Sequence, residues 1–115
     1  MNDEKFRTLH FPKLDLLNPT IESNLFKMTE ELGEVCAEVG KHRGLNGETI
    51  QVSKEEYEVL NAIAKETLDV MQSCSTMLNL LESMYGVDVD SNYKQHVEKL
   101  VKRKYVSEDI LNLIK

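Results

Sequence analysis

The feature that most constrains this chain is the segment 53–85, which no proline or glycine interrupts. Apolar side chains recur in it at spacings of three and four, which predicts one helix with a broad apolar face. Ser53 followed by Glu56 matches a capping box at its start, and Gly86 is a typical residue just past a helix end. At 1.5 Å per residue such a helix is about 50 Å long. The chain is therefore predicted to be predominantly helical.

Shorter periodic segments predict the remaining elements. Asn18-Pro19 is a typical helix start, and an apolar stripe follows it up to Gly40. No alternating strand pattern bounded by turn residues is present. The chain is thus predicted to be a single all-α domain, an antiparallel helical bundle. The predicted parts of this domain, residues 1–115, are a docked N-terminal arm over 1–17 and helices over 18–40, 53–85, 91–105 and 107–115.

The long apolar face of the 53–85 helix needs more partners than three other helical segments provide. A second copy of the chain is the natural source of the missing wall. We therefore expect self-association, as a dimer or a tetramer, to complete the bundle.

Charge and composition exclude several classes of partner. Fourteen Lys and Arg stand against twenty Asp and Glu, giving a net charge of −6. A chain with no basic excess is not expected to bind nucleic acid or an anionic membrane surface. The N-terminus lacks the pattern of a signal peptide, and two cysteines, Cys36 and Cys74, are too few for a disulfide scaffold. These features predict a cytoplasmic protein.

Two acidic motifs carry the chemistry that the sequence suggests. Residues 30–34 read Glu-Glu-Leu-Gly-Glu, an EExxE pattern, and Glu66-Thr67-Leu68-Asp69 is an ExxD pattern. At about 100° per residue, Glu31, Glu34 and Glu38 form an acidic ridge beside the apolar stripe of their helix, and Glu30 points further out. Two packed helices could bring four carboxylates to one groove. These four are Glu31, Glu34, Glu66 and Asp69.

Converging carboxylates repel each other unless protons or cations neutralise them. The candidate ligands are all oxygen, which favours Mg²⁺ or Mn²⁺ over softer ions. Mg²⁺ held by few carboxylates usually takes further ligands from substrate phosphates. The residues alone leave a second interpretation open, because acidic runs on helices are often solvated faces.

The segment Lys27-Met28-Thr29-Glu30-Glu31-Leu32-Gly33-Glu34, together with the ExxD motif, resembles the MazG-like all-α nucleoside triphosphate pyrophosphohydrolases. The segment 96–105 is similar to the third-helix ending of small members, although it reads Lys-Arg-Lys-Tyr where Arg-Gly-Tyr is more usual. The resemblance covers about residues 20–106. It implies Mg²⁺-dependent cleavage of a nucleoside triphosphate between the α- and β-phosphates, giving the monophosphate and pyrophosphate, as in clearing of the nucleotide pool.

The resemblance also implies roles for individual residues. Metal ligands would be Glu31, Glu34, Glu66 and Asp69. Lys99 and Arg103 would bind the substrate phosphates, and Glu30 would orient the attacking water or bind a further ion. In a metal-dependent mechanism of this kind, Glu30 or Glu38 would take the proton of the attacking water. The alternative is a non-catalytic helical oligomerisation or interaction module, with an acidic face that is solvated or binds a regulatory cation.

Overall fold

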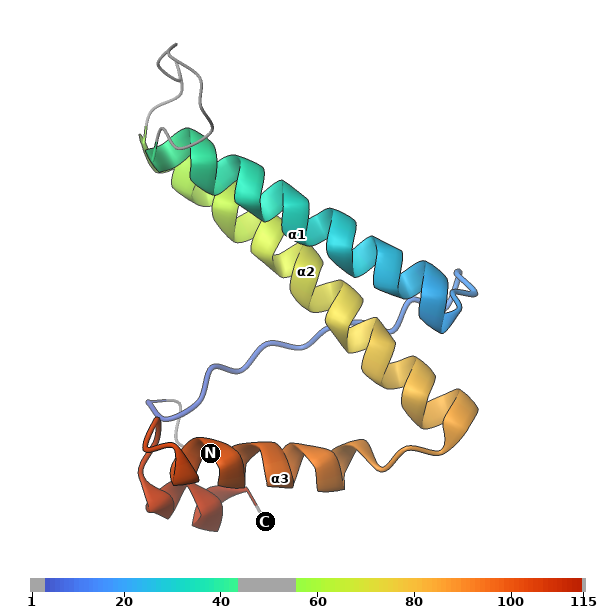
Figure 1. Cartoon of the computed structure of the whole chain (residues 1–115), viewed down its shortest axis with the longest axis vertical. Helices are drawn as coiled ribbons and strands as arrows, with labels where there is room; N and C mark the ends of the chain where they lie inside the picture. Colours follow the sequence, from blue (N-terminus) through green and yellow to red (C-terminus); the bar gives the residue numbers. More distant parts are fainter. Residues whose placement is uncertain (1–3, 44–55, 115) are drawn as a thin grey trace. The chain divides into compact units, whose positions relative to one another are not determined.

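The computed structural model describes residues 4–43 and 56–114, and these are all-helical, with no strand among them (Figure 1). This confirms the predicted all-α class. None of the described helices combines the length and the apolarity needed to cross a membrane. The chain divides into two compact units, one formed by Lys13–Leu80 and the other by Met1–Pro12 with Leu81–Lys115. The elements are α1 (Ile21–Arg43), α2 (Glu56–Tyr85), α3 (Val89–Lys102) and the 3₁₀ helix η1 (Glu108–Leu113).

The start of α1 differs from the predicted start at Asn18 because a later pair of side chains caps the helix. The Ser23 amide donates to Thr20 Oγ1 at 3.0 Å, and the Thr20 amide donates to Ser23 Oγ at 2.9 Å. This reciprocal pairing satisfies amides that the first turn leaves without helical partners. α1 therefore begins at Ile21, and it continues through the buried Gly40 to Arg43. The predicted cap at Ser53 lies outside the described residues.

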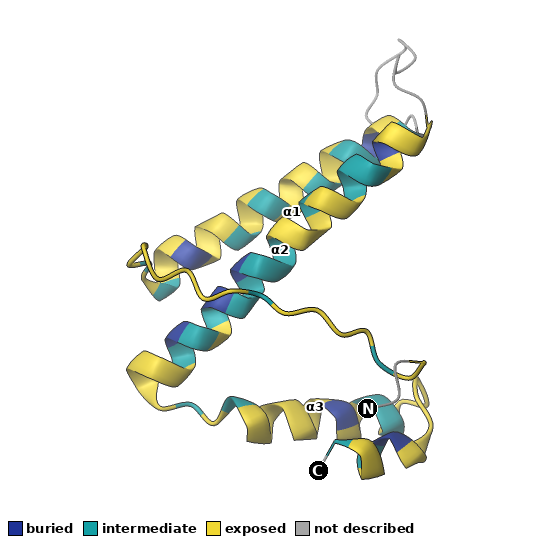
Figure 2. Ribbon diagram, turned by 180° about the vertical axis from the view of Figure 1, so that it is seen from behind, coloured by how far each residue is buried: buried dark blue, intermediate teal, exposed yellow. Residues whose placement is uncertain are grey.

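α1 and α2 lie side by side and run in opposite directions, as both ribbon views show (Figures 1 and 2). We call the surface along which the two helices meet the seam. It includes a hydrogen bond between the helices: Asn24, which is only 5% exposed, donates from Nδ2 to the Ser73 carbonyl oxygen at 2.9 Å. At about 100° per residue, Glu31 and Val35 lie on the same face of α1 as Asn24. The first helix therefore turns its Asn24 and Glu31 face toward α2.

The seam does not cover the whole of the predicted apolar stripe of α1. Leu25 and Leu32 belong to that stripe, yet they are 50% and 54% exposed. On α2 the exposed Leu60 and Leu78 likewise lie well away from the buried Ser73. Both stripes are displaced from the seam in the same rotational sense, by about 80–140°. Because the helices are antiparallel, this puts both stripes on one side of the hairpin.

We call this side the apolar flank and define it by Leu25, Leu32, Leu60, Met71 and Leu78. The opposite side of the hairpin carries charged and polar residues, including Lys27, Glu34 and Asp69.

The other unit is described by itself. Asp88 caps α3 by accepting from the Ser91 amide at 2.9 Å. Val97 of α3 and Ile110 of η1 are buried. Lys5 pairs with Asp109 at 3.2 Å, so the N-terminal segment contacts the C-terminal 3₁₀ helix.

α3 ends earlier than predicted, at Lys102 rather than residue 105. Lys104 has φ 62°, a left-handed conformation that breaks the helical run. Its amide donates to the Val101 carbonyl and the Tyr105 amide donates to the Leu100 carbonyl, both at 2.9 Å. These two bonds form a Schellman-type ending, in which glycine is the usual left-handed residue.

Replacing Lys104 with glycine is expected to raise the free energy of unfolding by about 0.5–1 kcal/mol. The left-handed conformation costs a residue with a Cβ roughly 1–2 kcal/mol, and the greater freedom of glycine in the unfolded chain offsets part of the gain. Urea unfolding followed by circular dichroism measures the difference. Lys102→Gly is the matched control, since Lys102 is helical and its replacement should destabilise by up to about 1 kcal/mol. A loss of stability in both variants would contradict the strained assignment of Lys104.

Candidate metal and phosphate site

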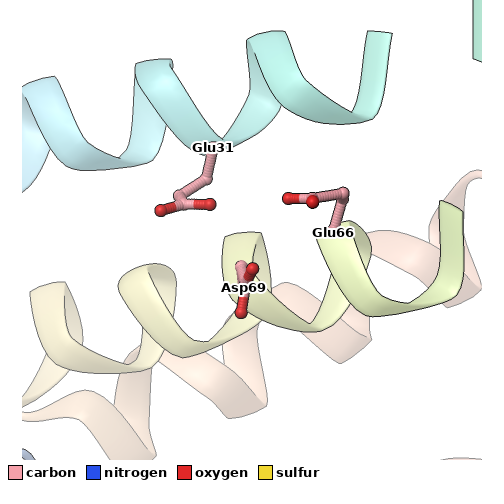
Figure 3. Close-up of side chains that lie close together, drawn as sticks. All are labelled: Glu31, Glu66 and Asp69. Carbon is pink, nitrogen blue, oxygen red and sulfur yellow. The ribbon is translucent and has the colours of Figure 1, made fainter. Parts of the chain in front are cut away.

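Three carboxylates from the two acidic motifs come together between α1 and α2 (Figure 3). Glu31 projects from α1 toward Glu66 and Asp69 of α2, and each residue offers an oxygen within 4.8 Å of the other two. Glu66 and Asp69 are three residues apart, so one face of α2 carries both. We call these residues the carboxylate trio. The structure thus groups three of the four predicted metal ligands.

The other predicted acidic residues lie around the trio. Glu34 is exposed and lies near enough to Glu66 to influence its charge state. Glu38 is half-buried: its Oε1 accepts from Lys41 Nζ at 3.2 Å, and its buried Oε2 has no hydrogen-bond partner within the described part of the chain. Glu30 is exposed and pairs with Lys27 at 3.4 Å.

The pKa of the Glu66 carboxyl is raised by its surroundings. Its partial burial, followed by the negative charge of nearby carboxylates, raises the pKa of Glu66 above the ordinary value of 4.5. The charged neighbours, in falling order of influence, are Glu34, Asp69, Glu31 and Glu38. A raised pKa means that the folded chain holds the proton of Glu66 more tightly than the unfolded chain does. The ionised cluster is therefore unfavourable until a cation compensates it.

Lys27 supplies part of that compensation from one turn earlier on α1. Its Nζ lies 2.8 Å from Glu31 Oε1 and 3.4 Å from Glu30 Oε1. The hydrogen bond to Glu31, its charge, and the weaker contact with Glu30 raise the pKa of Lys27, so the ammonium form is favoured. The exposed Lys27 side chain thus neutralises part of the negative charge at the Glu31 end of the trio.

A pocket of about 310 Å³ lies on the polar side of the hairpin next to the trio. This volume is at the lower end of the range for small-molecule sites. Its charged end includes Lys27, Glu31 and Asp69, and its apolar end is formed by Leu14, Leu17 and Pro19 of the segment before α1. The remaining lining residues are Ser23, Asn24, Gln72, Ser73 and Thr76. The pocket therefore joins an ionic region to an apolar one.

Sequence reasoning missed the pocket residues outside the acidic motifs. One spacing does connect them to the trio: Asn24 precedes Glu31 by seven residues, and Ser73 follows Glu66 by seven. Seven residues are about two helical turns, so each helix carries both members of its pair on one face. The hydrogen bond from Asn24 to Ser73 thereby keeps Glu31 level with Glu66.

The predicted phosphate-binding residues belong to the other compact unit. Lys99 lies in the last turn of α3, and Arg103 is its C-cap, with its amide donating to the Lys99 carbonyl at 3.0 Å. Because α3 ends at Lys102, the predicted helical continuation through Lys104 is wrong. Phosphate binding by Lys99 and Arg103 stays a prediction.

The donor set of the trio fits a hard divalent cation. All three side chains offer carboxylate oxygens, which Mg²⁺ and Mn²⁺ prefer. Within the described part of the chain, this group of ligands contains no thiol or imidazole. After burial, the charges of nearby carboxylates contribute to the raised pKa of Glu66, and such an ion would offset those charges. No protein-family model, curated protein or solved structure matches the chain.

Proposed function

We propose that this chain is a MazG-like, Mg²⁺-dependent nucleoside triphosphate pyrophosphohydrolase that releases a nucleoside monophosphate and pyrophosphate. The observation that carries the proposal is the convergence of Glu31 from the EExxE motif with Glu66 and Asp69 from the ExxD motif. Two motifs far apart in the sequence supply one group of hard oxygen ligands beside a pocket.

In this proposal Glu31, Glu66 and Asp69 hold the ion, and Glu34 adds a further carboxylate. Bound Mg²⁺ would supply positive charge to the phosphate oxygens and acidify the attacking water. The proton acceptor would be Glu30, which pairs with Lys27, or Glu38, which pairs with Lys41 through Oε1 and whose Oε2 has no hydrogen-bond partner in the described part of the chain. A positioned carboxylate with a free oxygen is suited to general base catalysis.

The pocket supports a substrate with an anionic and an apolar part. Leu14, Leu17 and Pro19 would contact a nucleoside, while the charged end of the pocket faces the phosphate chain. Lys99 and Arg103 are proposed to bind the outer phosphates, with the planar fork of Arg103 suited to two oxygens.

The end of α3 departs from the family pattern in sequence but is compatible with it in backbone conformation. Lys104 stands where the resembled family usually has glycine, and its left-handed φ of 62° is the conformation that glycine favours. The antiparallel pair α1 and α2 is likewise compatible with one half of the proposed antiparallel bundle.

The test is a panel of canonical and modified nucleoside triphosphates assayed with Mg²⁺, with monophosphate, pyrophosphate and orthophosphate measured separately. The proposal predicts pyrophosphate in equal amount to the monophosphate and no turnover in EDTA. Thermal melting gives a second readout, since an ion at 100 times its dissociation constant stabilises the folded state by about 2.7 kcal/mol. Failure to hydrolyse any nucleotide, with melting insensitive to Mg²⁺, would favour the non-catalytic interaction module.

We further propose that two copies of the chain associate through the apolar flank, either as a dimer or as the dimeric half of a tetramer. Leu25 and Leu32 of α1 share this flank with Leu60 and Leu78 of α2, and all are exposed. Exposed apolar stripes at helical spacing on one side of a hairpin are what a second hairpin would cover.

Leu32→Glu is expected to dissociate the proposed dimer, because it places a charge at the centre of an apolar contact. A central contact of this kind contributes about 2 kcal/mol or more, so the dimer dissociation constant should rise at least thirtyfold. Light scattering should give twice 13.2 kDa for the parent and a smaller mass for the variant. Leu16→Glu is the control, since Leu16 is exposed but lies outside the two helices. A monomeric parent at micromolar concentration would contradict the interface.

A further inference from the structure

We propose that Lys27 is an exchangeable counter-ion: it pairs with Glu31 while no divalent cation is bound, and it turns to the phosphate chain when the cation takes Glu31. This inference rests on the proposed function and adds a step of ligand exchange within the same site. It gives Lys27, which lies one turn before Glu31 and outside the EExxE motif, a binding role beyond its ion pair.

The contacts of Lys27 place it at the edge of the trio. Its ammonium lies 2.8 Å from Glu31 Oε1, and among the ion pairs of residues 4–43 and 56–114 this is the pair that reaches the trio. The two partners differ in freedom, because the Glu31 side chain is 12% exposed and that of Lys27 is 56% exposed. Glu31 is therefore held in the seam, and Lys27 is the partner that can move.

A divalent cation and Lys27 compete for the same oxygen region. Glu31 is the contribution of α1 to the trio, so an ion bound by all three residues must approach the carboxylate that Lys27 contacts. An ion bound to Glu31 and the Lys27 ammonium beside it would repel each other, and little water is available next to the half-buried Glu31 to screen this repulsion. Binding of the ion is thus expected to weaken the contact between Lys27 and Glu31.

The displaced ammonium has an anion-binding position within reach. Lys27 lines the pocket together with Glu31, Asp69 and Ser23, on the side where the phosphate chain is proposed to lie. Its flexible stem carries three hydrogen-bond donors, which suit phosphate oxygens but require no fixed geometry. The Lys27 ammonium, which neutralises Glu31 when no divalent ion is bound, would then neutralise a phosphate when the ion and the substrate are bound.

Lys27→Met separates this role from that of a plain ion pair, because it removes the charge and keeps the apolar stem. Without phosphate ligand, we expect the variant to bind Mn²⁺ about 3–10-fold more tightly than the parent, as measured by calorimetry. With saturating Mg²⁺, we expect its affinity for imidotriphosphate, a probe with no base, to be about 5–10-fold weaker. The two effects have opposite signs because the ammonium repels the ion and attracts the phosphates, whereas an ion pair that takes part in neither binding step would change neither affinity.

Lys41→Met is the matched control. Lys41 makes a similar ion pair with Glu38, at 3.2 Å, but does not line the pocket. It should bind imidotriphosphate within twofold of the parent. Lys27→Arg should keep imidotriphosphate binding near the parental value, because it retains the positive charge.

Two outcomes would overturn the inference. Unchanged Mn²⁺ and imidotriphosphate affinities in Lys27→Met, with a parent that binds both, would show that Lys27 is only a surface ion pair and would leave the proposed function intact. Changes of the same sign in both affinities would exclude exchange between the two ligands. A parent that binds neither probe would instead contradict the proposed function, and the inference with it.

Discussion

Replacing Asp69 with asparagine is expected to lower Mg²⁺-dependent hydrolysis of the best nucleoside triphosphate by at least about 100-fold. Asp69 supplies one of the three converging carboxylates, and asparagine keeps its shape while removing the charge that holds the ion. Loss of a residue that only supports a metal ligand already costs about 10–100-fold, so loss of a ligand should cost more. Steady-state kinetics at several Mg²⁺ concentrations measures the effect. Glu58→Gln, an exposed carboxylate of the same helix, is the control.

The same substitution should not destabilise the metal-free chain. Asp69 is one of the charges that raise the pKa of Glu66. Because the pKa of Glu66 is higher in the folded chain than in the unfolded chain, the free energy of unfolding falls as the pH rises from the ordinary pKa through the raised one. Asp69→Asn should reduce this loss, so its advantage in urea unfolding should grow between pH 4 and pH 7. A variant that retains near-parental turnover at saturating Mg²⁺ would remove Asp69 from the site.

Asn24→Asp is expected to lower the free energy of unfolding at pH 7 by about 3 kcal/mol. Asn24 is buried in the seam, and its Nδ2 donates to the Ser73 carbonyl oxygen at 2.9 Å. A carboxylate cannot donate this hydrogen bond and would leave an unpaired charge facing a carbonyl oxygen, a situation that typically costs 3–5 kcal/mol. Chemical unfolding followed by circular dichroism measures the loss.

Two controls isolate the lost donor. Asn24→Leu should stay within about 1 kcal/mol of the parent, because an apolar side chain of similar size leaves no buried charge. Lowering the pH should restore part of the stability of Asn24→Asp, since a protonated carboxyl can donate to Ser73. Equal stability of Asn24→Asp and the parent at pH 7 would mean that water reaches this part of the seam.

The existence of the helices could be predicted from the sequence, but the face by which α1 meets α2 could not. Apolar periodicity locates a stripe that avoids water, and it does not say which surface covers the stripe. Leu25 and Leu32 belong to the apolar stripe of α1, and the structure leaves them about half exposed. The seam contains Asn24 and Glu31 instead: Asn24 makes a cross-helix hydrogen bond to Ser73, and Glu31 lies opposite Glu66 and Asp69.

The candidate site follows a similar division. The three-residue spacing of Glu66 and Asp69 was sufficient to put both on one face of a helix. Their position opposite Glu31 depends on the register of the two helices, which the contact of Asn24 with Ser73 fixes and no motif encodes. The left-handed conformation of Lys104 was also not predicted, because lysine itself gives no signal for it and only the glycine usual at this position in the resembled family points to it.

The most direct test of the account is a double-mutant cycle on Mn²⁺ affinity with Glu31→Gln and Glu66→Gln. If both helices hold one ion, each single substitution should weaken Mn²⁺ binding at least about tenfold, and the double variant should bind scarcely more weakly than either single one. Calorimetric titration of the four proteins gives the coupling between the two residues. Binding losses that simply add, or Mn²⁺ affinity that neither substitution changes, would contradict a shared metal site between α1 and α2.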